Sequence, residues 1–277
     1  YFQRAGMSNV LGIDPARNVA QIANHKGIVT LYEFFRESLA IDMGESADVV
    51  IALNVLGHVA DLNGFVRGIR KILKPDGVAV FEVPYVRDTI DLGAFDQIYF
   101  EHLYYYSLTA LVNLVTWNQL QVQRAERIDI HSGSLRLWVG HPKEVHSRAM
   151  LRILEREKQL GINRMDYYRH FARRVCDSGS ALKHFLCGLK RQGKRLIAYG
   201  AAAKGTQLFN YIGADSSTIA CVVDETPTKI GKYVPGVRIP VVSPTEMGNP
   251  DYILLTARNW EQEITGKYPQ FKGRWII

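Results

Sequence analysis

The fold is indicated most clearly by residues 48–84, DVVIALNVLGHVADLNGFVRGIRKILKPDGVAVFEVP. They open with a continuous apolar run at residues 48–53, the pattern of a strand covered on both faces in a parallel sheet. A helix is predicted over residues 62–73, and the Lys-Pro-Asp-Gly turn at residues 74–77 leads into a second apolar run at residues 78–83. Strand, helix and strand thus alternate at the spacing of a doubly wound α/β sheet.

A shorter strand is predicted upstream, over residues 9–13, and it ends in Asp14 before a helix over residues 18–26. In an open parallel sheet, ligands bind beyond the carboxyl ends of the strands. A carboxylate at such an end can accept hydrogen bonds from both hydroxyls of a ribose, which makes Asp14 a candidate cofactor-binding residue. Because Pro15 and a helix follow, an ordinary helix cap is the alternative interpretation.

A second series of strands follows a long polar helical stretch at residues 146–192. Its predicted strands are all short and apolar, and they lie at residues 195–199, 219–223 and 251–255. We therefore predict an α/β protein with two doubly wound Rossmann-like domains in tandem. The boundary is expected near residue 143, which gives domains at residues 1–142 and 143–277.

The composition, 47% hydrophobic and 22% charged over 277 residues, is that of a soluble globular protein. No apolar run is long enough to span a membrane, and no segment has the pattern of a signal peptide. Cys176, Cys187 and Cys221 are widely spaced, which predicts no disulfide framework, no metal site in these residues and a reducing, cytoplasmic setting. The net charge of +7 comes without a long basic run, so we expect no nucleic-acid partner, and we expect a monomer.

Residues 95–108, FDQIYFEHLYYYSL, contain the densest group of reactive side chains. A phenol (Tyr99), a carboxylate (Glu101) and an imidazole (His102) fall within four residues, after a predicted strand and before a predicted helix. Taken singly, each has an ordinary explanation, since Glu101 and His102 can form a solvated pair and the tyrosines can pack in a core. Further along, Arg136 lies in a predicted strand and either binds a ligand or pairs with a carboxylate.

Residues 200–205, GAAAKG, join a predicted strand to a predicted helix. Small residues such as Gly200 let backbone amides approach a phosphate at the helix N-terminus, and Lys204 adds positive charge. The spacing is not that of a Walker loop. Asp224, at the end of the next strand, is placed to hold a ribose. We therefore interpret Gly200, Lys204 and Asp224 as candidate substrate-binding residues, with dinucleotide binding or a purely structural duplicated domain as alternatives.

Residues 48–84 resemble the class I methyltransferases that use S-adenosylmethionine. In that class the loop after the corresponding strand lines the cofactor, and a Leu-Lys-Pro-x-Gly turn precedes the next strand. The resemblance implies that Asn54 and Val55 line the S-adenosylmethionine site. It also implies that the glycine-rich cofactor loop of the class lies upstream of Tyr1.

The order of the motifs is similar to that of the nucleotide-sugar C-methyltransferases of deoxysugar biosynthesis, over essentially the whole chain. The matching motifs occur in family order at residues 12–16, 54–58, 99–102, 133–136, 199–205 and 223–227. The resemblance implies an N-terminal zinc-binding module upstream of these residues, and zinc in that module alone. It also implies that Tyr99, Glu101, His102 and His58 lie at the reacting sugar carbon, and that Arg136 and residues 200–224 assist the nucleotide-sugar.

The implied reaction is methyl transfer to a ring carbon, C-3 or else C-5, of a dTDP-linked keto-deoxysugar through an enolate. A carbon next to a ketone becomes nucleophilic after losing a proton, which requires a base with a pKa near the working pH. Histidine has such a pKa. We assign His102 as the base, Glu101 as its orienting partner, and Tyr99 and His58 as oxyanion donors or proton relays. The alternatives are an NAD-dependent nucleotide-sugar oxidoreductase and a non-catalytic carbohydrate-binding or scaffold protein.

Overall fold

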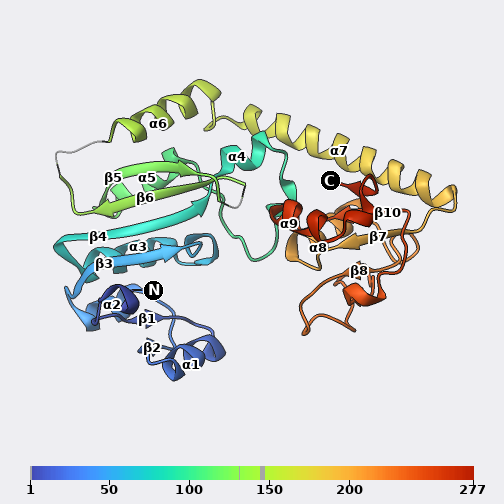
Figure 1. Ribbon diagram of the computed structural model, residues 1–277. Coiled ribbons are helices and arrows are strands. Elements are labelled where there is room, and N and C mark those ends of the chain that lie inside the picture. Colours follow the sequence, from blue (N-terminus) through green and yellow to red (C-terminus); the bar gives the residue numbers. More distant parts are fainter. Residues whose placement is uncertain (1, 131, 144–146) are drawn as a thin grey trace. The chain divides into compact units, whose positions relative to one another are not determined.

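The computed structural model describes residues 2–130, 132–143 and 147–277 (Figure 1). Its elements group into two compact units, each made of segments that are separated along the chain. The first unit consists of Tyr1–Val83, Leu108–Glu126 and Leu135–Leu154. The second unit consists of Pro84–Ser107, Arg127–Ser134 and Glu155–Ile277. The compact units therefore do not correspond to a single cut near residue 143, because each contains residues from both sides of it. A functional division at that position stays a prediction.

The strands of the first unit form two sheets (Figure 1). Their bounds are β1 Gly12–Ile13, β2 Thr30–Leu31, β3 Ala47–Leu53, β4 Leu73–Pro84, β5 Gln121–Ile128 and β6 Ser134–Gly140. β1 and β2 pair in parallel, whereas the other strands are ordered β3-β4-β6-β5, with β3 parallel to β4. β5 and β6 are neighbours joined by a short connection, which suits antiparallel strands, so this sheet is mixed.

The helices of the first unit follow the predicted alternation. Their bounds, with those of the short 3₁₀ turns, are η1 Gln3–Ala5, α1 Arg17–His25, α2 Glu37–Met43, η2 Leu56–His58, α3 Leu62–Ile72, α5 Leu108–Trp117 and α6 Arg148–Leu160. The amide of Gly64 donates to the Asp61 carboxylate at 2.9 Å, which caps the start of α3. Phe65 and Ile69 lie four residues apart on its buried face, as an amphipathic helix requires.

The turn predicted at residues 74–77 lies inside β4, because that strand begins directly after α3. Ala47 of β3 pairs with Leu73, but Val49 pairs with Val78, so the register shifts between these two pairs. Residues 74–77 therefore form a bulge in the ladder.

β3 differs from the expected strand with two covered faces. It lies at one edge of its sheet and has β4 as its neighbour among the described residues. The side chains of Val49, Ile51 and Leu53 are 53%, 42% and 47% exposed. The continuous apolar run correctly indicated a strand, but not its place at an edge.

The second unit contains a five-stranded sheet in the order β11-β10-β7-β8-β9, in which each neighbouring pair is parallel. The bounds are β7 Leu196–Tyr199, β8 Val222–Val223, β9 Val241–Val242, β10 Tyr252–Leu255 and β11 Trp275–Ile276. The chain proceeds from β7 to β8 and β9 on one side, and then crosses to β10 on the other. The carboxyl ends of β7 and β10 therefore form a topological switch point, where such sheets bind ligands.

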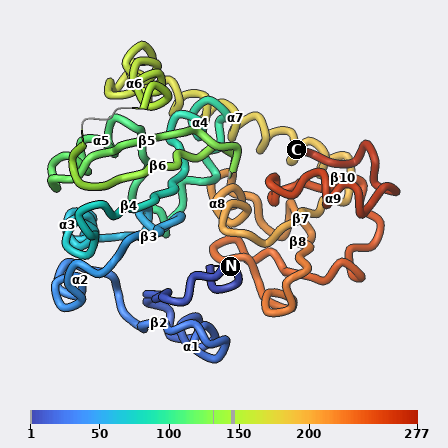
Figure 2. Tube along the Cα trace, turned by 60° about the vertical axis from the view of Figure 1, so that its left-hand side comes forward, coloured from blue at the N-terminus to red at the C-terminus, as the bar shows by residue number. Residues whose placement is uncertain are grey.

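Helices cover both faces of this sheet. The helices and 3₁₀ turns of the unit are α4 Val86–Asp91, η3 Phe95–Gln97, α7 Met165–Arg191, α8 Ala203–Ile212, η4 Pro244–Glu246, η5 Arg258–Trp260, α9 Glu261–Lys267 and η6 Pro269–Phe271. Leu196 and Ala198 of β7 pack with side chains of α7 and α8, whereas Ile197 and Tyr199 pack with those of α9 and η6. Figure 2 shows the trace of this unit around β7 and β8. The α/β prediction is confirmed, and the second unit is doubly wound.

Candidate functional site

The reactive cluster predicted at residues 95–108 contains a direct contact between Tyr99 and His102. The phenolic oxygen of Tyr99 lies 3.0 Å from Nε2 of His102, and the two ring centroids are 4.2 Å apart. The amide of His102 donates to the Tyr99 carbonyl at 3.0 Å, so one turn of backbone brings the rings together. Tyr105 fixes the same loop, because its hydroxyl donates to the Gln97 carbonyl at 3.3 Å.

The surroundings of Tyr99 keep its phenol protonated. Burial raises the pKa of Tyr99, and the negative charge of Glu101 raises it further. Glu101 itself lies at the surface, and His102 is half-buried. A protonated phenol that contacts an imidazole can donate a hydrogen bond or pass a proton, the two roles expected of Tyr99.

A pocket of about 520 Å³ in the second unit is lined by Tyr99 and by the loops after β7, β8 and β10. It contains three of the predicted substrate-binding residues, Gly200, Lys204 and Asp224. Because these loops follow the carboxyl ends of parallel strands, the pocket lies at the switch point of the sheet. Tyr99 thus contacts His102 and also lines the pocket that contains the predicted substrate loop, and all of these residues belong to one unit.

Gly200 brings the loop after β7 against the loop after β10. Its φ is +105°, and a Cβ atom at this position would lie 2.7 Å from Cβ of Ala257. The Thr256 hydroxyl donates to the carbonyls of Tyr199 and Gly200, at 2.8 and 2.6 Å. A side chain at position 200 would therefore separate the two loops that form the pocket.

Asp224 is held by hydrogen bonds from its own unit. Oδ2 accepts from the amide of Ala201 at 2.8 Å and from Nζ of Lys229 at 3.2 Å, and Oδ1 accepts from the amide of Thr226 at 2.8 Å. Burial acts to raise the pKa of Asp224, but the hydrogen bonds from Thr226, Ala201 and Lys229 outweigh it, and the pKa is lowered. The carboxylate therefore organises the loop after β7, whether or not it also contacts a ribose.

Lys204 lies in the first turn of α8, beside the pocket. Burial lowers the pKa of its ammonium group, the charge of Asp96 opposes that effect, and the charge of Arg258 adds to it. In the part of the chain that the structure describes, no ion pair joins Lys204 or Arg258 to a carboxylate, whereas Lys229 pairs with Asp224. Of the four cations that line this pocket, Lys204 and Arg258 are thus the two without an ion pair in the described residues, and Lys204 lies near a helix N-terminus, an arrangement that favours anions.

Sequence reasoning missed the residues that follow β10. Arg258, Asn259 and Trp260 line the pocket, and the Trp260 side chain is 62% exposed. The strand at residues 251–255 was predicted, so the rule that ligands bind at carboxyl ends could have found them. No glycine-rich motif marks this loop in the sequence.

Arg136 lies in the first unit, on β6, and contacts Glu82 of β4. Its Nε and Nη2 atoms donate to Oε2 of Glu82 at 3.1 and 2.8 Å. Glu82 is buried, at 4% exposure, so the guanidinium compensates a buried charge. This is the structural alternative considered for Arg136, and its role in substrate binding stays a prediction.

The predicted cofactor residues lie in the first unit at strand ends. Asp14 follows β1, is half-buried, and accepts a hydrogen bond at Oδ1 from the amide of Ala16 at 2.7 Å. Asn54 follows β3 in the left-handed region, with φ +55°, and Val55 next to it is exposed. His58 ends η2 in the same unit and is exposed to solvent.

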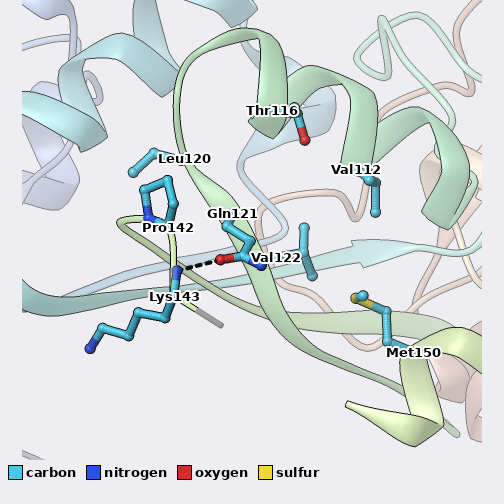
Figure 3. Close-up of a pocket in the computed structure, with 8 residues that line it drawn as sticks. All are labelled: Val112, Thr116, Leu120, Gln121, Val122, Pro142, Lys143 and Met150. Carbon is cyan, nitrogen blue, oxygen red and sulfur yellow. Dashed lines mark hydrogen bonds between the residues drawn. The ribbon is translucent and has the colours of Figure 1, made fainter. Parts of the chain in front are cut away.

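A second pocket, of about 510 Å³, lies in the first unit (Figure 3). It is lined mainly by apolar side chains from α5, β5 and α6, and in Figure 3 the Lys143 ammonium points away from them. The amide of Lys143 donates to Oε1 of Gln121 at 2.6 Å. The pocket contains none of the predicted site residues, and its lining offers little for acid–base chemistry.

Neither a metal cluster nor a membrane span is found in the part of the chain that the structure describes. Within residues 2–130, 132–143 and 147–277, no group of three or more His, Cys, Asp or Glu side chains is placed to bind a metal ion. Across the same residues, no helix has the length and apolar character needed to cross a bilayer.

Comparison with known families gives two matches that together span almost the whole chain. A methyltransferase domain model matches residues 1–125, and a C-methyltransferase C-terminal domain model matches residues 129–277. The C-methyltransferase NovU of Streptomyces niveus is 32% identical over 286 residues, which cover 100% of this chain and 68% of that protein. A ubiquinone biosynthesis O-methyltransferase of Azorhizobium caulinodans is 32% identical over 77 residues, covering 26% of this chain and 30% of that protein.

Two solved structures with partial similarity are named as methyltransferases. A putative S-adenosylmethionine-dependent methyltransferase from Listeria monocytogenes has a TM-score of 0.42 and 16% identity, and the match covers 51% of this chain and 84% of that one. The Burkholderia thailandensis 1,6-didemethyltoxoflavin-N1-methyltransferase has a TM-score of 0.40 and 13% identity, over 51% of this chain and 65% of that one.

The α/β fold and the family model matched by residues 1–125 define the class, which is that of the S-adenosylmethionine-dependent methyltransferases. The second family model covers more than half of the chain, and the full-length relative carries the same activity in its name. The chain belongs to the C-methyltransferase family, as its motifs predicted.

Proposed function

We propose that the chain transfers a methyl group to a ring carbon, C-3, of a dTDP-linked keto-deoxysugar through an enolate. The observation that carries this proposal is the Tyr99–His102 contact, because Tyr99 also lines the pocket that contains Lys204 and Gly200. A carbon-directed methyltransferase needs a base for an acidic C–H next to a site for an anionic, nucleotide-linked substrate. These residues supply both within one unit.

The carbon to be methylated must first lose a proton. His102 takes the proton that leaves the ring carbon, and the electron pair moves onto the neighbouring ketone oxygen as an enolate. Tyr99 donates a hydrogen bond to that oxygen or passes the proton to Nε2 of His102, with which it is already in contact. In this proposal Glu101 orients the imidazole, and His58, which the resemblance assigns to the same chemistry, would be a further donor.

The residues at the ends of β1 and β3 fit S-adenosylmethionine. One carboxylate oxygen of Asp14 accepts from the amide of Ala16, and in this proposal the other would accept from the ribose hydroxyls. Asn54 and Val55 would line the rest of the site, because the left-handed backbone at Asn54 turns the chain at the strand end. When bound, S-adenosylmethionine supplies an electrophilic methyl group.

The remaining predicted residues would bind the other end of the substrate. Lys204 brings positive charge to the N-terminus of α8, and Gly200 permits close approach of the loop. Asp224 holds that loop in shape through the amide of Ala201. In this proposal residues 1–142 carry the cofactor and residues 143–277 assist the nucleotide-sugar, with Arg136 acting through the fold or the sugar.

The test uses the full-length protein, which would include the cofactor loop expected upstream of Tyr1. It measures methyl transfer from labelled S-adenosylmethionine to a panel of dTDP-linked keto-sugars, together with solvent deuterium exchange at the adjacent carbon. We expect methylation at C-3, and exchange even without the methyl donor. His102→Asn should lower both rates by about 100- to 10,000-fold, the usual cost of losing a general base. His184→Asn is the matched control, because His184 is exposed on α7 of the same unit.

Two outcomes would contradict the proposal. Exchange that persists in His102→Asn would show that another group is the base. If NAD and not S-adenosylmethionine raised the melting temperature, and keto-sugar reduction replaced methylation, the oxidoreductase alternative would hold instead.

A further inference from the structure

The pocket in the second unit has a lining that the predicted residues leave unexplained. The loop after β10 contributes Arg258 and Trp260, neither of which is needed for the proton transfer proposed above. Both side chains are exposed, and both belong to η5 at the carboxyl end of a parallel strand. Exposed aromatic and cationic side chains at a switch point are typical of a ligand-binding surface.

The charges around the pocket divide into two groups. Lys229 pairs with Asp224, and Lys267 pairs with Glu225 and Glu263, so these charges neutralise each other. The charges of Asp96 and Arg258 both act on the Lys204 ammonium, Asp96 favourably and Arg258 unfavourably. In the described part of the chain neither Lys204 nor Arg258 forms an ion pair, so the Asp96 carboxylate offsets their repulsion only in part. Two neighbouring cations repel each other, so an anion bound between them relieves an unfavourable contact.

The groups that surround Lys204 and Arg258 indicate which kind of anion would bind between them. Lys204 lies in the first turn of α8, and Ala202 and Ala203 at the start of that helix also line the pocket. The first amides of a helix have no partner within the helix, and among the described residues the N-cap Ala202 supplies no side-chain acceptor for them. A guanidinium, an ammonium and backbone amides together match the several oxygens of a diphosphate. A single carboxylate would use fewer of these donors.

The indole of Trp260 offers a flat apolar surface next to the same cations. Its 62% exposure means that packing does not explain its position at the pocket. Bases stack on such exposed aromatic rings, and the contact tolerates different bases. An aromatic surface beside cations suits a nucleoside diphosphate, whose base can stack while its phosphates meet the positive charges.

We propose that Arg258, together with Lys204, binds the diphosphate of the nucleotide-linked substrate, and that Trp260 stacks on its base. This inference rests on the proposed function for the identity of the substrate. It assigns nucleotide recognition to the loop after β10, and it leaves Asp224 to hold the loop after β7.

The experiment measures the dissociation constants of dTDP and of inorganic pyrophosphate by calorimetry, with the full chain. Arg258→Gln should weaken both ligands by about 10- to 100-fold, the effect of losing a charge-assisted hydrogen bond. Trp260→Ala should weaken dTDP by about 5- to 50-fold and leave pyrophosphate unchanged, because stacking needs the base. Arg191→Gln is the matched control for charge, since Arg191 is exposed at the end of α7.

Intrinsic fluorescence provides a second measurement. If Trp260 had only a structural role, its emission would not change when dTDP binds. Stacking should quench the Trp260 emission when dTDP binds, and Trp260→Phe should remove the quenching while it retains most of the affinity. Trp117→Phe should leave the quenching intact, because Trp117 is an exposed tryptophan on α5 of the first unit.

The outcomes separate this inference from the proposed function. If Arg258→Gln and Trp260→Ala bind dTDP as the wild type does while sugar methylation continues, the inference is wrong and the proposed function remains. If the variants lose binding as expected, the inference holds, and His102→Asn tests the chemistry separately. If the wild type binds no dTDP and methylates no dTDP-linked sugar, both are overturned.

Discussion

Two parallel strands that each precede a candidate binding loop have opposite environments. β7 lies between β10 and β8, and all of its residues, Leu196–Tyr199, are buried. β3 lies at a sheet edge, and its apolar residues Val49, Ile51 and Leu53 are largely exposed. Among the described residues, the loop after β7 therefore follows a strand with a neighbour on each side, whereas the loop after β3 follows a strand with one neighbour.

The contrast bears on the two halves of the proposed reaction. The pocket beside β7 is fixed by packing on both sheet faces and by Thr256 and Asp224 within the same unit. The cofactor residues after β1 and β3 belong to two separate sheets. We therefore expect the substrate loop to be the more rigid of the two, and the loop after β3 to depend more on bound cofactor.

The largest effect is expected from truncation of equivalent isoleucines in the two strands. Ile197→Ala in β7 removes a fully buried side chain and should lower the free energy of unfolding by about 2–5 kcal/mol. Ile51→Ala in β3 should cost less than about 1 kcal/mol, because that side chain is 42% exposed. Urea denaturation of the two variants measures the difference. Equal losses would mean that the exposed face of β3 is covered in solution.

A second, smaller effect should come from the close approach at Gly200. Gly200→Ala combines an unfavourable φ with a clash against Ala257, and we expect a loss of about 2–4 kcal/mol in unfolding free energy. Gly231→Ala is the matched control and should lose about 1 kcal/mol, since Gly231 also has positive φ but a Cβ atom there would meet no described atom within 4 Å. Thermal denaturation compares them. Similar losses would show that the two loops are not in tight contact.

The Arg136–Glu82 pair tests how the sheet containing β3 is held. Arg136→Met leaves the Glu82 carboxylate buried without its partner, and it should cost about 2 kcal/mol, because the arginine is itself partly exposed. Adding Glu82→Gln should recover much of the loss. Arg152→Met, on the exposed face of α6, should change stability little. If Arg136→Met left stability intact but raised the KM for the sugar, its role would be in binding.

The smallest expected effect concerns the pH dependence of the loop after β7. The folded pKa of Asp224 is lowered, so its ionised form stabilises the native state at pH values above the unfolded pKa of about 4. The advantage disappears as the pH falls through the folded pKa. Asp224→Asn should therefore lose about 1 kcal/mol relative to wild type at pH 7 and almost nothing at pH values below about 3. A constant difference across this range would contradict the assigned hydrogen bonds.

The sequence predicted where strands and helices alternate more reliably than it predicted which strands would be neighbours in a sheet. The apolar runs at residues 48–53 and 195–199 both became strands, because side-chain hydrophobicity and β-branching act locally. Nothing in either run shows how many neighbours the strand acquires. Among the described residues β3 has one neighbour and β7 has two, and which strands pair is decided between distant segments and not by local composition.

For the candidate site too, features that are local in the sequence could be predicted, whereas those that depend on distant segments could not. Tyr99 and His102 are three residues apart, so their contact could be anticipated from the motif. Gly200, Lys204 and Asp224 were predicted from small residues and charges at strand ends; the structure brings them to one pocket, and their role in substrate binding stays a prediction. Arg258 and Trp260 were missed, because their relevance depends on β10 lying next to β7, a strand from a much earlier part of the chain.

By itself, then, the sequence determined the α/β class, the C-methyltransferase motifs and the reactive types of side chain, since these depend on periodicity and short-range order. The tertiary structure decided which of those side chains share a pocket, which carboxylates are already engaged, and which strand is left at an edge. The physical reason is that hydrophobic burial rewards any compact arrangement, whereas hydrogen-bonded pairing between distant segments selects one of them.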